Sequence, residues 1–501
     1  MEPILKKLVI VGGGSAGWMT AAALSSLLDP KLVTITLVES DQIGTIGVGE
    51  ATIPDIINFN RILGIDEATF MKATNATFKL GIEFVDWGRK GDRYIHPFGQ
   101  HGVDMRGIDF HNFWLHSRAG GNDQPIENYS LCSVLAKRNK FTLPDPNPRS
   151  VLSHVRYAYH FDATLYARFL RQYAEARGVR RVEGTVQKVE QAAETGFIAG
   201  LLLEEGTEVE GDFFFDCTGF RALLSGETLG VPFVDWSHWL PCNSALAVPS
   251  AHSGPLTPYT RSTAKGSGWQ WRIPTQQRTG NGHIYCRDFI SDDEAASVLL
   301  SGLDGEALAE PRQIRFTAGH RRDFWTANCV AIGLSAGFLE PLESTSIYLI
   351  QEGISRFISL FPTAATSQIV RDEYNRHMRT EFEQVRDFII LHFSATRRDD
   401  TPFWQYCGNM SIPDSLKYKI ELFREAGRIF RYEEELFTRP SWVAVMLGQG
   451  IMPKNTDPIV STLPVEEVTG SIESMRMAME QAADQAPTHE QFIARYCPAE
   501  V

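Results

Sequence analysis

The sequence lacks several features that mark whole classes of protein. Among its 501 residues, no apolar run approaches the ~18 residues of a membrane-spanning helix. The seven cysteines are scattered and include no Cys-x-x-Cys pair, which argues against a disulfide framework and a structural zinc site. We therefore expect no membrane span, no metal site and a reducing, cytoplasmic location.

Basic residues are also in the minority. The chain has 48 Lys and Arg against 61 Asp and Glu, which gives a net charge of −13. An acidic surface repels phosphate backbones and argues against nucleic acid as the main partner. The composition, 43% hydrophobic and 22% charged residues, is typical of a globular protein and excludes a disordered or fibrous chain.

What is present begins with a glycine pattern. Residues 8–11 predict a buried strand, residues 18–28 a helix and residues 33–38 a second strand, which together form a βαβ unit. Gly12-x-Gly14-x-x-Gly17 lies between the first strand and the helix. The three glycines allow a tight turn, a close approach of the main chain to a pyrophosphate, and close helix packing. The pattern predicts dinucleotide binding.

Three more residues belong to this expected site. Ser15 and Ala16 lead into the helix, whose N-terminal N–H groups attract phosphate. Glu39 ends the second predicted strand, 22 positions after Gly17, where an acidic residue would hold ribose hydroxyls. The pattern alone does not separate FAD from NAD.

The rest of the chain predicts a mixed α/β fold. We expect a loop at residues 43–54, a helix at 163–178, and strands at 179–189, 197–204, 208–216 and 330–332. Residues 248–288 predict a second β region. From residue 343 the chain predicts mainly helix, with breaks at Pro402, Pro413 and Pro440. The expected architecture is an FAD-binding, Rossmann-like (hydroxylase-type) module interleaved with a substrate β-sheet over residues 1–365, and a mainly helical substrate-covering region over residues 366–501.

Two segments favour FAD over NAD. One is the apolar run that ends at Asp216-Cys-Thr218-Gly219, and the other leads from Val330 into Gly333 and Leu334. Both look like the later flavin-contacting turns of the hydroxylase-type FAD fold. No second glycine pattern follows a strand, so we expect no separate NAD(P)H domain.

Four further segments make a specific match. They are residues 47–54 (GVGEATIP), 78–81 (FKLG), 269–274 (WQWRIP) and 338–345 (FLEPLEST). With the glycine pattern, they make the chain resemble the flavin-dependent halogenases, in the tryptophan and indole branch. The resemblance covers at least residues 8–405.

The resemblance implies an FADH2-dependent halogenation of an electron-rich, indole-like ring. Reduced FAD, O2 and chloride or bromide would give hypohalous acid beside the flavin, with Gly49, Glu50 and Ala51 among the cofactor residues. The acid would pass through an internal tunnel to Lys79, and Glu343 would position it or accept the ring proton. Lys79 could act as an ammonium donor or as an amine that becomes a haloamine, and the sequence leaves both open. A separate flavin reductase would supply FADH2.

The same resemblance assigns further roles. Thr345 and Ser346 match the place where main-chain N–H groups hold halide. Trp269 and Trp271 would shield the flavin from substrate, and residues 96–99 (HPFG) supply His96 and Phe98 as walls around the substrate ring.

The chain departs from the tryptophan halogenases near its C-terminus. Residues 441–453 (SWVAVMLGQGIMP) offer Trp442 as a substrate contact but no paired tyrosines or carboxylate that would grip a free amino acid. We therefore expect a more open pocket for indole or a larger indole- or phenol-like compound, and turnover of free tryptophan no better than that of indole.

Two alternatives remain at this point. An FAD-dependent aromatic hydroxylase would share the fold, but it has no use for Lys79. A non-catalytic flavin-binding protein would need a partner surface, for which the amphipathic residues 471–483 are the candidate. These residues could also support a homodimer.

Overall fold

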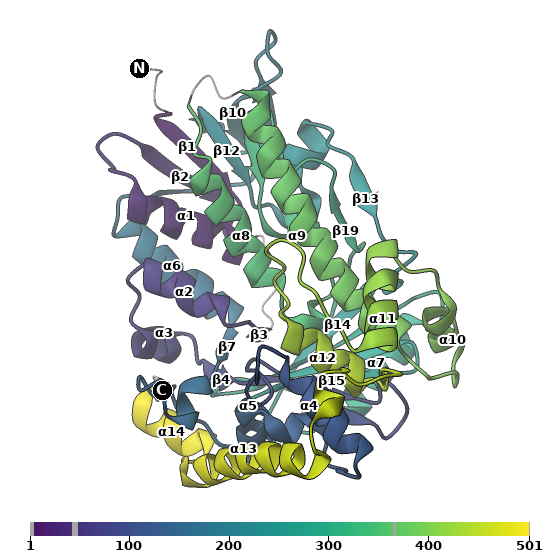
Figure 1. The fold of residues 1–501 in the computed structure, drawn as a ribbon. Coiled ribbons are helices and arrows are strands. Elements are labelled where there is room, and N and C mark those ends of the chain that lie inside the picture. The colour runs from purple at the N-terminus through teal and green to yellow at the C-terminus, as the bar shows by residue number, and fades with distance from the viewer. Residues whose placement is uncertain (1–4, 43–48, 364–366, 500–501) are drawn as a thin grey trace.

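The computed structural model describes residues 5–42, 49–363 and 367–499. A six-stranded sheet in the order β20-β21-β12-β1-β2-β8 forms one end of the molecule (Figure 1). β1 runs parallel to both of its neighbours, β2 and β12, and its apolar run Leu-Val-Ile-Val is fully buried. The strands are β1 (Lys7–Val11), β2 (Thr34–Glu39), β8 (Arg180–Glu183), β12 (Phe213–Asp216), β20 (Trp325–Thr326) and β21 (Cys329–Ala331).

The expected βαβ unit is confirmed. Its helix, α1 (Ser15–Leu27), begins three residues before the predicted start and contacts α6 (Ala163–Glu175) and α8 (Ser346–Ser359). Residues 17–25 of α1 are buried, and the small alanine side chains among them permit close packing between sheet and helices.

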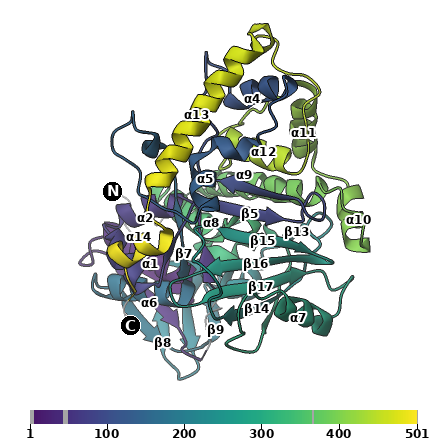
Figure 2. The same ribbon diagram turned by 90° about the horizontal axis from the view of Figure 1, so that it is seen from below.

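A seven-stranded, mainly antiparallel sheet forms the second layer, and Figure 2 shows several of its strands side by side. It confirms the predicted second β region. Its order is β18-β14-β17-β16-β15-β5-β6, and only β15 and β5 pair in parallel. The strands are β5 (Gly81–Val85), β6 (Arg93–Pro97), β14 (Ser244–Ser250), β15 (Thr260–Lys265), β16 (Gly268–Pro274), β17 (Thr279–Tyr285) and β18 (Arg312–Arg315).

Three small sheets complete the β-structure of the described residues. β4 (Thr77–Lys79) and β3 (Gly49–Ala51) flank β7 (Ala158–Asp162). The other two sheets join β9 (Val186–Gln191), β10 (Ile198–Leu203) and β11 (Glu208–Glu210), and β13 (Phe233–Asp235), β19 (Gly319–Arg321) and β22 (Gly337–Phe338).

Three local predictions are wrong. The single strand expected at residues 179–189 is two strands in different sheets, because Gly184 turns the chain with φ +154°. The strand expected at 208–216 is likewise divided at Gly211, where a Cβ would lie 2.7 Å from Val9. The loop expected at 43–54 includes β3, which pairs with β7, while residues 43–48 lie outside the described part.

The C-terminal part is helical, as predicted. Pro402 stands at the start of α10, Pro413 precedes α11, and Pro440 lies in the first turn of α12, which are positions where a missing N–H costs nothing. The helices are α9 (Gln368–Ser394), α10 (Pro402–Asn409), α11 (Asp414–Ala426), α12 (Arg439–Gly448), α13 (Val465–Gln485) and α14 (His489–Tyr496). None of the helices in the described ranges combines the length and apolar character needed to cross a bilayer.

The remaining helices belong to the first 301 residues. They are α2 (Asp55–Ile62), α3 (Glu67–Ala73), α4 (Phe110–Ala119), α5 (Leu131–Lys137) and α7 (Asp292–Ser301). One hydrophobic cluster extends from Leu5 to Cys497, so the helical part shares its core with the sheets. The expected boundary between residues 365 and 366 falls at residues outside the described part, and the two-region division stays a prediction.

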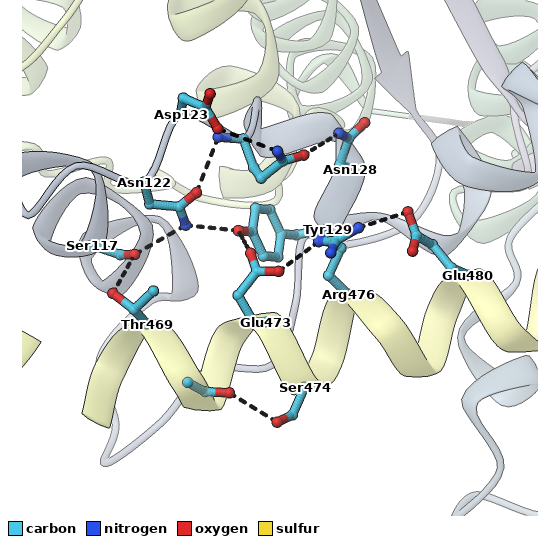
Figure 3. A network of polar contacts seen from close by, with 12 residues as sticks. Ser117, Asn122, Asp123, Asn128, Tyr129, Thr469, Glu473, Ser474, Arg476 and Glu480 are labelled. Atoms are coloured by element: carbon cyan, nitrogen blue, oxygen red, sulfur yellow. Dashed lines mark hydrogen bonds and ion pairs between the residues drawn. The ribbon is translucent and has the colours of Figure 1, made fainter. Parts of the chain in front are cut away.

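The amphipathic segment at 471–483 belongs to α13, which lies along α4 and α5 (Figure 2). Its apolar face is covered by the chain itself. Polar contacts fix the same interface: Tyr129 donates from its hydroxyl to Glu473 over 2.6 Å, and the hydroxyls of Ser117 and Thr469 lie 2.8 Å apart (Figure 3). The face proposed for a partner is therefore used within the fold.

We expect Ile472→Ala to lower the free energy of unfolding by about 2–5 kcal/mol, because Ile472 is fully buried and its truncation leaves a cavity. Met477→Ala is the matched control on the same helix, since Met477 is 56% exposed. Thermal melting of both variants checks this. Equal melting temperatures would show that α13 does not belong to the cooperative core.

Candidate active site

A cavity of about 560 Å³ opens where β1, β2 and β12 end, the edge at which open α/β sheets bind ligands. The predicted cofactor residues gather here. Of those described, the cavity is lined by Gly12, Gly14, Ser15, Ala16, Glu39, Gly49, Glu50, Ala51, Gly333 and Leu334. Gly17 lies beneath the loop rather than on the cavity wall. Gly47 and Val48 of the 47–54 motif lie outside the described residues.

The glycine loop shows which of its positions serve the fold and which serve a ligand. Gly12 has φ +109°, and a Cβ there would lie 2.2 Å from the Cys217 carbonyl oxygen. A Cβ on Gly17 would lie 1.8 Å from the Gly12 carbonyl oxygen. Gly14 differs, because no protein atom lies within 4 Å of its Cβ position. Space at Gly14 fits a group that must approach the main chain closely.

The start of α1 supports the same reading. Gly14 is its N-cap and supplies no side-chain acceptor, so the first N–H groups of the helix have no side-chain cap. A pyrophosphate would accept from them. Glu39 lies beside the loop, and Arg181 holds one of its oxygens with a 2.6 Å hydrogen bond from Nε. The donor set and the space fit the nucleotide part of FAD.

Lys79 ends β4 and has no exposed surface. Its Nζ donates to the Thr52 carbonyl oxygen over 2.9 Å and to the Ser344 hydroxyl over 2.7 Å, and it lies 4.9 Å from the centre of the Phe98 ring. Burial lowers the pKa of Lys79 to about 7, although Glu343 and Glu50 act in the opposite direction. The amine and the ammonium are therefore both populated near neutral pH.

Glu50 is a second titratable group close to Lys79. Burial raises the pKa of its carboxyl to about 7, and the charge of Lys79 opposes that rise. Glu50 lines the cofactor cavity, and its charge interacts with that of Lys79. The protonation of Lys79 therefore depends on whether Glu50 is ionised.

Glu343 is held between two imidazoles. Its Oε2 lies 2.9 Å from His96 Nδ1, and its Oε1 lies 2.8 Å from His392 Nε2. Burial alone would raise the pKa of this carboxyl, but His96 and His392 outweigh burial and lower it to about 2. Glu343 is therefore a carboxylate at neutral pH, despite having almost no exposed surface.

Two groups of this centre were not predicted from the sequence. His392 lies on α9, and its Nδ1 also faces the Phe388 carbonyl oxygen at 2.9 Å. Ser344 follows Glu343 with φ +61°, a left-handed conformation that turns its hydroxyl to Lys79. Its position beside Glu343 in the 338–345 motif was a signal for Ser344, whereas His392 has no motif.

The expected halide residues stand at the start of α8. Thr345 is the N-cap and Ser346 the first helical residue, and no side chain caps the helix. Thr345 is fully buried with no hydrogen-bond partner for Oγ1 among the described residues, and Ser346 lines the cofactor cavity. The helix terminus faces the cavity with donors in place, and halide binding stays a prediction.

Trp269 and Trp271 alternate along β16, and both line the cofactor cavity. Trp269 donates from Nε1 to Glu340 over 2.7 Å, and burial raises the pKa of that carboxyl to about 8. Trp271 packs against Gly282, where a Cβ would lie 2.0 Å from the indole ring. Both indoles are fixed in the cavity wall.

A second cavity, of about 360 Å³, is lined in part by Phe98, whose ring centre lies 4.9 Å from Lys79 Nζ. Val443 also lines it. Trp442, the predicted substrate contact, is 3% exposed and packs against Phe388 with ring centres 4.8 Å apart, while Lys419 Nζ lies 4.2 Å from its ring. The structure thus brings His96, Phe98 and Lys79 together. Trp442 lies further from them, because Phe388 packs between it and His96.

Together these features define a flavoprotein fold with a buried lysine beside the cofactor cavity. The sequence matches the family described as tryptophan halogenase over residues 7–465. It is 36% identical over 519 residues to tryptophan 6-halogenase SttH from Streptomyces toxytricini, which covers 97% of this chain and 98% of that protein. The chain belongs to the tryptophan halogenase family.

Solved structures agree with this assignment. A flavin-dependent halogenase from Xanthomonas campestris is 48% identical, with a TM-score of 0.96 and 99% of each chain covered. BrvH, a flavin-dependent halogenase from Brevundimonas sp. BAL3, is 47% identical, with a TM-score of 0.96, 99% of this chain and 100% of that chain covered. These matches confirm the FAD-binding fold and flavin-dependent halogenation with FADH2 and halide, and they do not favour the hydroxylase or the non-catalytic alternative.

Two glycine variants separate the fold from the cofactor site. We expect Gly14→Ala to melt like the wild type without FAD but to bind FAD about tenfold or more weakly, because its methyl group enters space that the main chain leaves for phosphate. Gly17→Ala should instead fold poorly, because its Cβ collides with the Gly12 carbonyl. Melting curves and FAD fluorescence titrations measure both effects. Normal FAD affinity in Gly14→Ala would contradict the assigned cradle.

Proposed function

We propose that Lys79 transfers the halogen of hypohalous acid to an indole-like ring and that Glu343 accepts the ring proton. One observation carries this proposal. Lys79 Nζ is bonded to Ser344, which lines the cofactor cavity, and lies over Phe98, which lines the second cavity. A single buried nitrogen thus stands between the space for the cofactor and the space for an aromatic substrate.

The cofactor cavity would hold FAD through the glycine loop, Glu39 and the turn at Gly333. Reduced FAD, with O2 and halide, supplies hypohalous acid. A separate flavin reductase provides the reduced cofactor. Chloride or bromide would accept from the N–H groups at Thr345 and Ser346, where the positive end of α8 favours an anion.

Lys79 acts in this proposal as an ammonium. Two of its protons go to Thr52 and Ser344, and the third remains for the oxygen of hypohalous acid. The ring face of Phe98 and the nearby carboxylates favour the cation. The donated hydrogen bond polarises the oxygen–halogen bond, so the ring carbon attacks the halogen and the oxygen leaves as water with an added proton.

Glu343 completes the proton balance. Attack by the ring leaves one proton on the halogenated carbon, and a carboxylate must take it to restore aromaticity. His96 and His392 favour the ionised form of Glu343: His96 is hydrogen-bonded to its Oε2, and His392 Nε2 lies 2.8 Å from its Oε1. The proton added to the leaving oxygen comes from Lys79, and the ring proton taken up by Glu343 replaces it when both groups return to their starting states. The net change is one ring hydrogen replaced by halogen, with hypohalous acid converted to water.

Trp269 and Trp271 have a structural part in the proposal. Their rings form the wall of the cofactor cavity and exclude an aromatic substrate from the flavin. Only a species as small as hypohalous acid then reaches Lys79, which favours halogenation over direct oxygen transfer to the ring.

Lys79→Met tests the lysine. We expect the variant to fold and bind FAD, because Met fills the same volume, but to form no halogenated indole in the presence of a flavin reductase, NADH and bromide. Lys72→Met on α3 is the control, since Lys72 lies outside the cavity linings. Mass spectrometry detects the bromine isotope doublet. Wild-type product levels from Lys79→Met would overturn the assignment.

The pH dependence tests the protonation state. Since the pKa of Lys79 is about 7, the ammonium predominates below pH 7, and we expect kcat to fall as the pH rises from 6 to 8. Glu50→Gln should move the midpoint to lower pH, because the Glu50 charge raises the pKa of Lys79. This shift separates Lys79 from titration of hypohalous acid in solution, which the variant cannot alter. A rate that rises with pH would favour a haloamine instead.

A further inference from the structure

The second cavity changes character away from Phe98. Beyond Phe98 and Val443 its lining is mainly polar or charged, and it reaches the surface loops before α4 and α12. The charged members are Asp104, Asp109, Arg156, Arg431 and Arg439. A pocket for bare indole needs no such lining, because indole carries one N–H and no charge.

The charges in this lining do not cancel. Arg439 forms an ion pair with Asp109 at 2.6 Å, and Asp104 accepts from the Phe110 N–H at the start of α4. Arg156 and Arg431 donate only to main-chain carbonyl oxygens, and neither has an ion-pair partner within the described ranges. Three arginines against two aspartates give a local positive excess in a chain whose net charge is −13.

Two of the three histidines in the lining, His101 and His111, do not supply this charge. Burial, with His96 and His111 nearby, lowers the pKa of His101 to about 3, and burial also lowers the pKa of His111. Both are neutral at physiological pH. The positive excess therefore comes from the guanidinium groups, which keep their protons and favour planar oxyanions.

We propose that this cavity takes an indole-like substrate with a net negative charge, whose ring lies at Phe98 and whose short side chain carries a carboxylate and no ammonium, held by Arg431 with Arg156 and Arg439 around it. The inference rests on the proposed function and names the substrate class of the same site. The sequence led us to expect a larger indole-like compound, and the inference adds that this compound is negatively charged.

The test compares four substrates with one ring: indole, indole-3-propionate, tryptamine and tryptophan. In the wild-type enzyme with FAD, reductase and bromide, we expect kcat/KM for indole-3-propionate to exceed that for indole by about tenfold, the gain of one charge-assisted hydrogen bond. Tryptamine, which presents a cation to the arginines, should fall below indole. Calorimetric titration of indole and of indole-3-propionate into the holoenzyme measures the same preference without turnover.

Arg431→Gln identifies the residue. We expect the preference for indole-3-propionate over indole to fall towards one, while Arg424→Gln on the neighbouring α11, outside the cavity lining, leaves it unchanged. Arg431 is exposed, so the variant should fold normally, which its melting curve checks. Bromination of indole without any preference for the acid, or a preference for tryptamine or tryptophan, overturns this inference alone. No bromination of any of the four overturns the proposed function.

Discussion

The structure depends on the burial of one amine. Lys79 has no exposed surface, and an ammonium without water must be stabilised by fixed acceptors and charges. These come from parts of the chain that are far apart in sequence: the Thr52 carbonyl, the Ser344 hydroxyl, the Glu50 and Glu343 carboxyls and the Phe98 ring. They meet at β4 only because the fold brings these distant segments together.

The pKa values of that amine and of the two carboxyls around it are determined in different ways. Burial acts on all of them and disfavours charge, so Lys79 and Glu50 both have a pKa near 7. Glu343 escapes, because His96 and His392 each lie within 3 Å of one of its oxygens. At neutral pH the site therefore holds an ionised carboxylate, Glu343, beside a lysine that is populated both as the amine and as the ammonium. Such a difference in pKa between neighbouring groups separates the base from the acid in a proton transfer.

Much of the fold and part of the site could be predicted from the sequence, and the features that were missed share a physical cause. The glycine loop, the second β region and the helical C-terminal part follow from local patterns of turn residues and apolar spacing, which act over a few residues. The divided strands at Gly184 and Gly211 were missed because apolar spacing does not show that a chain changes sheet. Lys79 and Glu343 were found through motifs, whereas His392 was not, because nothing near it in sequence indicates its contact with Glu343. The charged end of the second cavity was missed for the same reason: Arg156 and Arg431 meet only in the folded chain.

The position of Phe98 explains why the two cavities can differ so much in chemistry. Its ring lies 4.9 Å from Lys79 Nζ and also lines the second cavity, so a substrate packed against this ring would lie near the lysine without entering the cofactor cavity. The cofactor cavity is lined by the glycine loop and by Trp269 and Trp271, and its wall is mainly apolar. The second cavity carries three arginines and two aspartates. The arginines of the second cavity and the buried lysine are separate parts of the site, so a change at the arginines can alter substrate choice without altering the chemistry at Lys79.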